Sequence, residues 1–378
     1  MTNLLPGIKP HSEGVISIDD LPDLQSLKEL RHHEESYLVL YFASITPPPL
    51  AFAPPVATGQ FQLTKPASLP AIRSLLSVSP APYIKRTPST LEIRSSSGFT
   101  SWTFSTALGL LTSWRHNEGP NFLTESPTLG FYRALTDNDR GGHGREWNDR
   151  RLHQASTHNR ETTWKETGTG AVVTVTGRFA PPVLAWGVDT TIIYTFSGDQ
   201  LHIRVKASPD PKSIRLPGTF ARIGLTLGLK EVGDVSWWGR GPGESYRDSK
   251  HAQLFGLYTK TVDELWTDYE FPQDGGNRTD VRTVVFKNSV GKALLRARFG
   301  DLEGASFSAS HYSTKDIDES THPYELRKKR REDTVVRLDW AHHGLGTGSC
   351  GPWTRSEYQL RSSQHFDYEV LLDPAIHW

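Results

Sequence analysis

The sequence predicts an all-β protein built from antiparallel sheets. Apolar and polar residues alternate with a period of two along most of the chain, for example over 190–196 and 201–205, and this period is typical of half-buried strands. The 32 glycines and 25 prolines among 378 residues favour short elements joined by turns. Only two short stretches, 146–154 and 251–262, are expected to be helical.

The N-terminal segment 1–64 is predicted to be part of a β-sandwich domain. It contains three strand-like stretches, 15–18, 37–42 and 60–63. A free-standing sandwich usually has about seven strands, and isolated hairpins are marginally stable. We therefore expect this segment to be incomplete by itself.

Residues 65–88 are interpreted as a linker. They carry five prolines and show little periodicity, and proline-rich segments of this kind act as extended spacers.

The remaining residues, 89–378, are predicted to form one large antiparallel sandwich. Turn-forming residues separate several of its strands, as hairpins require. Strands are expected over 90–93, 172–175, 190–196, 201–205, 223–227, 283–286, 294–299, 335–338 and 368–372.

Charge and cysteine content exclude several classes of function. Lys+Arg and Asp+Glu both number 42, so no overall field favours nucleic acid or an anionic membrane as a partner. No apolar run approaches the roughly 18 residues of a membrane span. Cys350 is the one cysteine, and the first residues do not resemble a signal peptide. A cytoplasmic location is therefore expected.

An aspartate-rich segment, 131–149, places Asp137, Asn138 and Asp139 before two glycines. The spacing is partly that of a calcium loop, but the bidentate glutamate is missing and Arg140 lies inside the segment. We expect these side chains to cap their own turn by accepting backbone N–H bonds.

Two further segments combine aromatic, glycine and charged residues. The segment 236–250 contains Trp237 and Trp238 before a GRGPG run, in which the proline removes a donor that a phosphate cradle would need. At least one of these tryptophans is expected to lie in the core, and an aromatic face beside polar groups also suits a sugar ring. In 268–283 we expect a turn held by Arg278 or Arg282 bonding to carboxylates.

A glycine-rich segment, 342–353, carries two histidines, Cys350 and Trp353. Spaced glycines allow the backbone to approach another group closely. The spacing does not match a zinc site, and a Cys-His nucleophile pair lacks an orienting third group. The basic run 327–331 is interpreted as a solvated hairpin tip and not as a nuclear address.

In this order, the segments resemble the C-terminal part of the large β-galactosidases of glycoside hydrolase family two. The resemblance covers about 120–378, and AFAPPVATGQFQL at 51–63 resembles the end of the immunoglobulin-like domain that precedes this part. The matching motifs are RALTDNDRGG (133–142), WWGRGPGESYRD (237–248), YEFPQDGGNRTDVR (269–282), FSASHYS (307–313) and HHGLGTGSCGP (342–352).

The resemblance implies a galactose-mutarotase-like supersandwich over 89–378, preceded by a partial immunoglobulin-like β-sandwich over 1–64. It implies a part in hydrolysing terminal non-reducing β-D-galactose residues, as in lactose. Retaining hydrolysis uses two carboxyls about 5–5.5 Å apart, and in the family both lie on a barrel that this chain does not contain. The chain alone is therefore expected to be inactive and to need a catalytic chain or missing N-terminal domains.

Site residues follow from the same resemblance. Cys350 corresponds to the position whose side chain lies beside the sugar in the family. A cysteine cannot stack on a sugar as an indole does. Trp353 departs from the family pattern nearby and could supply that aromatic platform instead. Asp137, Asn138, Asp139 and Arg278 belong to structural loops. The family's Mg²⁺ ligands lie in the missing part, and Phe271 and Pro272 match a region near a peripheral Na⁺ site.

Two alternative functions stay open: a mutarotase-like sugar epimerase using a His and a Glu, or a non-catalytic carbohydrate-binding or oligomerisation module. A homo-oligomer of the complete protein stays open.

Overall fold

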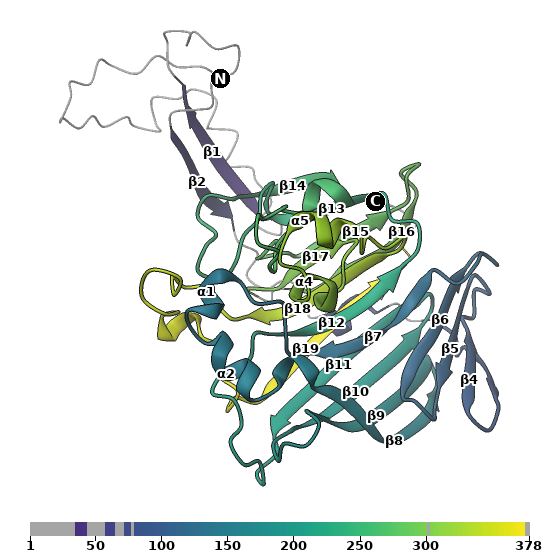
Figure 1. The fold of residues 1–378 in the computed structure, drawn as a ribbon. Helices are drawn as coiled ribbons and strands as arrows, with labels where there is room; N and C mark the ends of the chain where they lie inside the picture. Colours follow the sequence, from purple (N-terminus) through teal and green to yellow (C-terminus); the bar gives the residue numbers. More distant parts are fainter. Residues whose placement is uncertain (1–34, 44–56, 65–71, 77–78, 301–302, 375–378) are drawn as a thin grey trace. The chain divides into compact units, whose positions relative to one another are not determined.

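The computed structural model describes residues 35–43, 57–64, 72–76, 79–300 and 303–374 (Figure 1). The chain divides into two compact units, Met1–Leu69 and Pro70–Trp378. Strands dominate the described residues of both units, and all their pairings within the sheets are antiparallel. The all-β prediction is confirmed. In the described residues no helix is long and apolar enough to cross a membrane.

The first unit contains a hairpin of β1 (Ser36–Phe42) and β2 (Ala57–Thr64). These strands confirm the predictions over 37–42 and 60–63, whereas 15–18 lies outside the described residues. Tyr41 is 66% exposed and Phe61 55% exposed. The partial immunoglobulin-like domain over 1–64 stays a prediction.

The largest sheet of the second unit has nine strands in the order β14-β13-β15-β16-β19-β11-β10-β9-β8. Its central strands alternate as predicted, because in β10 every second side chain from Val188 to Phe196 is buried. The strands are β8 (Ser156–Thr167), β9 (Gly170–Ala180), β10 (Val188–Ser197), β11 (Gln200–Pro209), β13 (Asp234–Gly241), β14 (Leu254–Thr261), β15 (Thr283–Lys287), β16 (Ala293–Arg298) and β19 (Phe366–Asp373).

Two four-stranded sheets complete this unit, with the orders β17-β18-β12-β7 and β3-β4-β5-β6. The first contains β7 (Leu123–Gly130), β12 (Arg222–Leu229), β17 (Ser306–Ser310) and β18 (Thr334–His342). The second contains β3 (Tyr83–Arg86), β4 (Thr90–Arg94), β5 (Thr100–Ser105) and β6 (Leu110–His116).

Aromatic pairs join the four-stranded sheets to the large one. The ring centroids of Trp102 in β5 and Phe196 in β10 are 5.2 Å apart, and those of Trp237 in β13 and Phe307 in β17 are 5.5 Å apart. Such pairs each contribute about 0.5–1.5 kcal/mol beyond the area they bury. The core thus lies between layers of sheet, as in a sandwich. Trp237 is fully buried, which confirms that one tryptophan of the 236–250 segment belongs to the core.

The structure differs from the predicted linker, 65–88, from Ile72 onward. Ile72–Leu75 forms a 3₁₀ turn (η3) whose Ile72 is buried, and Tyr83–Arg86 is strand β3, paired with β4. Pro80 and Pro82 stand just before β3, where a missing backbone donor costs no ladder bond. The other domain boundaries stay predictions.

Helices are few and short among the described residues. They are α1 (Asp137–Arg140), α2 (Gly144–Asp149), α3 (Val262–Leu265), α4 (Thr314–Asp318) and α5 (Pro323–Arg327), with 3₁₀ turns η4 (Leu152–Gln154) and η5 (Ser356–Tyr358). The predicted helix over 146–154 is present as α2 and η4, interrupted where Arg151 adopts a φ of 54°.

Two further predictions were wrong. The stretch 251–262 is mostly strand β14 and not helix, because it pairs with β13 and its Tyr258 ring packs 5.5 Å from that of Trp237. The basic run 327–331 is not a hairpin tip. It covers the end of α5 and the turn before β18, and Arg330 and Arg331 pair with Asp263 and Asp333 at 2.6 and 2.7 Å.

Candidate functional site

The aspartate-rich segment folds as a capped turn. Thr136 is the N-cap of α1: its hydroxyl accepts a bond from the backbone N–H of Asp139 (3.2 Å), while the Asp139 carboxylate accepts from the backbone N–H of Thr136 (3.0 Å). This reciprocal arrangement is a capping box. Asp137 pairs with Arg140 at 2.8 Å. The expectation that these side chains cap their own turn is confirmed for Asp139.

Asp139 also belongs to a buried network of charged groups. Its Oδ1 lies 3.1 Å from Nη2 of Arg133, whose Nε lies 3.9 Å from Asp274. Asp274 in turn accepts bonds from Arg337 (2.5 Å) and from the Tyr246 hydroxyl (2.9 Å). Burial raises the pKa of Asp139, and the nearby Arg133 guanidinium opposes that shift. Buried charges persist only when paired, so these carboxylates are structural.

Arg278 holds the turn after Gly275 and Gly276. Carboxylate partners were expected, but its partners are carbonyl oxygens. Its Nη1 donates to the carbonyls of Leu265 (2.8 Å) and Gly276 (2.7 Å), and its Nη2 donates to Pro242 (3.1 Å). Burial lowers the pKa of Arg278 to about 10. Asp280, two residues further along the chain, accepts bonds from Arg240 and Lys250 instead. Arg278 is therefore a structural residue of this loop.

Glu244 is likewise tied into the scaffold. Its carboxylate accepts bonds from the Tyr269 hydroxyl (2.7 Å), the Thr267 hydroxyl (3.2 Å) and the backbone N–H of Gly276 (2.5 Å). Burial raises its pKa, and these hydrogen bonds act against the rise. With its oxygens occupied in this way, Glu244 is poorly placed to act as a nucleophile.

The glycine-rich segment lies against α1 (Figure 1). Asn138 accepts bonds from the backbone N–H (3.2 Å) and the hydroxyl (2.7 Å) of Ser349. The two backbones are so close that a Cβ added to Gly141 would lie 2.1 Å from the carbonyl oxygen of Gly348. Glycine at 141 is thus required by this contact and not by its φ of −81°.

A second anchor holds the base of the same loop. The carboxylate of Asp248 accepts the backbone N–H groups of Leu345 (2.9 Å) and Gly346 (2.8 Å). The loop also closes on itself, since the N–H of Cys350 donates to the Thr347 carbonyl at 3.1 Å. The segment between β18 and η5, residues 343–354, is called loop 343–354 below. These bonds fix the backbone of its base, so the loop is preorganised.

Cys350 and Trp353 both lie at the surface of this loop. Cys350 is exposed, and Trp353 is 58% exposed. The indole of Trp353 packs edge-on against the imidazole of His143, with ring centroids 5.3 Å apart. The indole is thus held on one side by His143, while much of the ring stays open to solvent.

Beside Trp353 lies a group of rings in which His343 and Trp147 are buried and His143 is half-buried. The His143 ring lies 4.7 Å from that of His343, and Trp147 lies 5.3 Å from His343. Nδ1 of His343 accepts the backbone N–H of Leu360 at 3.1 Å, so the proton of the neutral ring is on Nε2. Burial lowers the pKa of His343 to about 2. The ring is neutral at physiological pH and supports the loop from below.

Sequence reasoning missed Asp248 and His343 as the supports of this loop. Asp248 lies 97 residues before Leu345, and no local spacing connects the two. The sequence also did not indicate which of the two adjacent histidines would support the loop. Both are buried, and His342 pairs instead with Asp339 at 2.6 Å.

The chain is similar in sequence to known β-galactosidases. The family model described as the β-galactosidase small chain matches residues 95–372. A β-galactosidase of Kluyveromyces lactis is 31% identical over 66% of this chain and 24% of its own length, and one of Vibrio cholerae is 32% identical over 72% and 26%. A β-galactosidase of Photobacterium profundum is 28% identical over 95% of this chain and 34% of its own length. The chain thus spans about a quarter to a third of these relatives.

Among solved structures, the chain is similar to a galactose mutarotase related enzyme from Lactobacillus acidophilus, with a TM-score of 0.38 and 8% identity over 77% of this chain and 96% of that one. It is also similar to a putative aldose 1-epimerase from Escherichia coli K12, with a TM-score of 0.37 and 8% identity over 77% and 98%.

Proposed function

Because the chain belongs to the β-galactosidase small-chain family, we propose that it is the terminal module of a β-galactosidase. In this role it works in the hydrolysis of terminal β-D-galactosides, such as lactose, together with a catalytic chain or with domains that precede it. The coverage of its relatives, 24–34% of their lengths, supports a module of a larger enzyme.

The engagement of its buried carboxylates supports the proposal that catalysis resides elsewhere. Retaining glycoside hydrolysis needs two carboxyls about 5–5.5 Å apart with free oxygens facing the sugar. Here Asp139, Asp274 and Asp339 pair with arginines, and Glu244 accepts three hydrogen bonds. None of these four is available as nucleophile or acid.

The single observation that carries the proposal is the fixed, outward-facing loop 343–354. Asn138 and Asp248 hold its backbone, while Cys350 and Trp353 stay exposed at its surface. A loop that is already ordered loses little entropy when it meets a partner or a sugar. In the assembled enzyme Cys350 lies beside the sugar, and the supported indole of Trp353 offers the aromatic face that cysteine lacks.

The epimerase alternative would need a His and a Glu on opposite sides of a sugar. The His202–Glu369 pair on β11 and β19 joins its two groups directly, with Nε2 and Oε2 3.1 Å apart. A substrate atom has no room between them, so this pair does not favour the alternative.

Mg²⁺ and Na⁺ are implied for the assembled enzyme and not for this chain. The described residues contain no group of three or more His, Cys, Asp or Glu side chains able to hold a metal ion. At the sequence-predicted Na⁺ region, the carbonyl of Pro272 accepts a bond from Arg140 at 3.4 Å, and the Arg140 guanidinium lies 4.2 Å from the Phe271 ring centre. A guanidinium there disfavours a second cation.

The proposal is tested by complementation. We expect the purified chain alone to give no turnover of a chromogenic β-galactoside, and activity to appear when the catalytic partner from the same source is added. Heat-denatured chain added to the same partner is the control. Turnover by the chain alone that survives repurification and follows the protein peak would contradict the proposal.

A further inference from the structure

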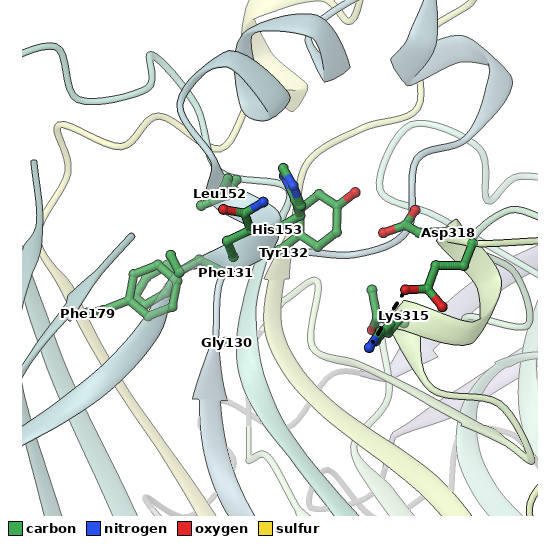
Figure 2. A pocket seen from close by; sticks show the side chains of 12 residues that line it. Gly130, Phe131, Tyr132, Leu152, His153, Phe179, Lys315 and Asp318 are labelled. Carbon is green, nitrogen blue, oxygen red and sulfur yellow. Dashed lines mark ion pairs between the residues drawn. The ribbon is translucent and has the colours of Figure 1, made fainter. Parts of the chain in front are cut away.

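A pocket of about 480 Å³ lies among the end of β7, η4 and α4 (Figure 2). Its volume is within the range of sites that hold small molecules, about 300–1,000 Å³. None of the loop residues discussed above lines it: Cys350, Trp353, Asn138 and Asp248 are all absent from its wall. The proposed role in galactoside hydrolysis gives this pocket no task.

The inner wall of the pocket is apolar. Phe131 and Phe179 are buried, with ring centroids 4.5 Å apart, and Leu152 lies beside them. Tyr132 and His153 add two further rings whose centroids are 6.0 Å apart. Burial lowers the pKa of His153, and Arg151 shifts it in the same direction. The wall is therefore uncharged at neutral pH. Phe131, Leu152 and Phe179 expose almost no surface, so the rings open to a ligand are those of Tyr132 and His153.

The rim is polar and offers both acceptors and donors. Asp318 lies at the rim, exposed to the pocket, and its Oδ1 accepts the backbone N–H of Leu135 at 3.2 Å. Figure 2 shows the Tyr132 hydroxyl and the Asp318 carboxylate on the same side of the pocket. Thr314 accepts a bond from Arg337 at 2.8 Å, so its hydroxyl proton is left to donate. The amide of Gln154 can do both.

The charge of the rim argues against an anionic ligand. Lys315 pairs with Glu319 at 3.7 Å, and Glu319 is also within 3.6 Å of Lys329 (Figure 2). Lys315 and Lys329 thus share the one carboxylate of Glu319, while the carboxylate of Asp318 faces the pocket. A phosphate or carboxylate in the pocket would be repelled by the like charge of Asp318.

We propose that this pocket binds one neutral sugar ring. A pyranose has carbon-rich faces that suit the rings of Tyr132 and His153. Its hydroxyls suit Asp318, Gln154 and Thr314 at the rim. This inference does not rest on the proposed function, since it concerns a different surface of the chain and no bond is made or broken.

The test uses the full chain and D-galactose and D-glucose as probes, with binding detected by saturation transfer from the protein to the sugar protons in NMR. We expect binding by the wild type, and about a 10-fold or greater loss of affinity in Asp318→Asn, which removes a charged acceptor. Gln154→Ala, a change at an exposed side chain, is expected to weaken binding as well. Glu92→Gln on strand β4, which belongs to another sheet and contributes no residue to the pocket, is the matched control and should bind like the wild type.

Further arms separate the alternatives. Thermal unfolding of Asp318→Asn checks that it folds, and Gln154→Ala carries the test if it does not. Trp353→Ala should bind the probes unchanged, which separates this pocket from the loop of the proposed function. The inference is overturned if neither sugar shows transfer, if both pocket variants bind like the wild type, or if ethanolamine, a cationic probe, binds more tightly than the sugars.

Discussion

His343 shows how one buried side chain can link loop support to pH. Its Nδ1 accepts the N–H of Leu360, its ring is fully buried, and its folded-state pKa is about 2. The unfolded value is about 6.5. Between these values the unfolded chain binds a proton that the folded chain does not, so stability falls as the pH drops below about 6.5.

The substitution His343→Asn tests this linkage, because asparagine keeps an acceptor for the Leu360 N–H but does not titrate. Wild type should lose about 2 kcal/mol of unfolding free energy between pH 7.5 and pH 5.0 through this group. His343→Asn should lose correspondingly less in urea unfolding. Exposed His158→Asn is the matched control and should follow the wild type. An acid loss in His343→Asn as large as that of the wild type would contradict this assignment.

At the scale of elements, the close contact between α1 and loop 343–354 determines where Cys350 and Trp353 lie. Asn138 bonds to Ser349, and the backbone of Gly348 lies so close to Gly141 that no side chain fits at position 141. The contact joins two segments that are 211 residues apart in the sequence.

Gly141→Ala should disturb this contact, because the added Cβ would meet the Gly348 carbonyl oxygen at 2.1 Å. We expect a loss of about 1–3 kcal/mol in unfolding free energy, the usual cost of overpacking, and reduced activity after assembly with a catalytic partner. Gly168→Ala is the control, because a Cβ there meets nothing within 4 Å. Equal stability of the two variants would show that the contact does not position the loop.

At the scale of the whole molecule, what could be predicted depended on whether the signal was local. The alternation of β10 and the capping of its own turn by Asp139 are local features, and both predictions were confirmed. The helix expected over 251–262 failed because pairing with β13 outweighed a weak local preference. The carbonyl partners of Arg278 come from the end of α3, the residue after β13 and the turn at Gly276. The residues lining the pocket beside η4 come from four elements and their connections. No local spacing in the sequence could predict either arrangement.

From the family membership and the exposed loop, we propose that loop 343–354 forms part of the active-site mouth of an assembled β-galactosidase. Labelling of Cys350 tests it most directly, because this is the one cysteine of the chain and it is exposed. In the isolated chain the thiol should react with a thiol reagent at about the rate of a free exposed thiol.

The decisive measurement is the same rate in the complex with the catalytic partner, with and without saturating galactose, followed by mass spectrometry of the peptide that contains Cys350. We expect the reagent to label Cys350 more slowly in the complex, and more slowly still with galactose, because the partner and the sugar cover the loop tip. Labelling at the rate of the isolated chain, with no effect of galactose, would place Cys350 outside the active site and contradict the claim.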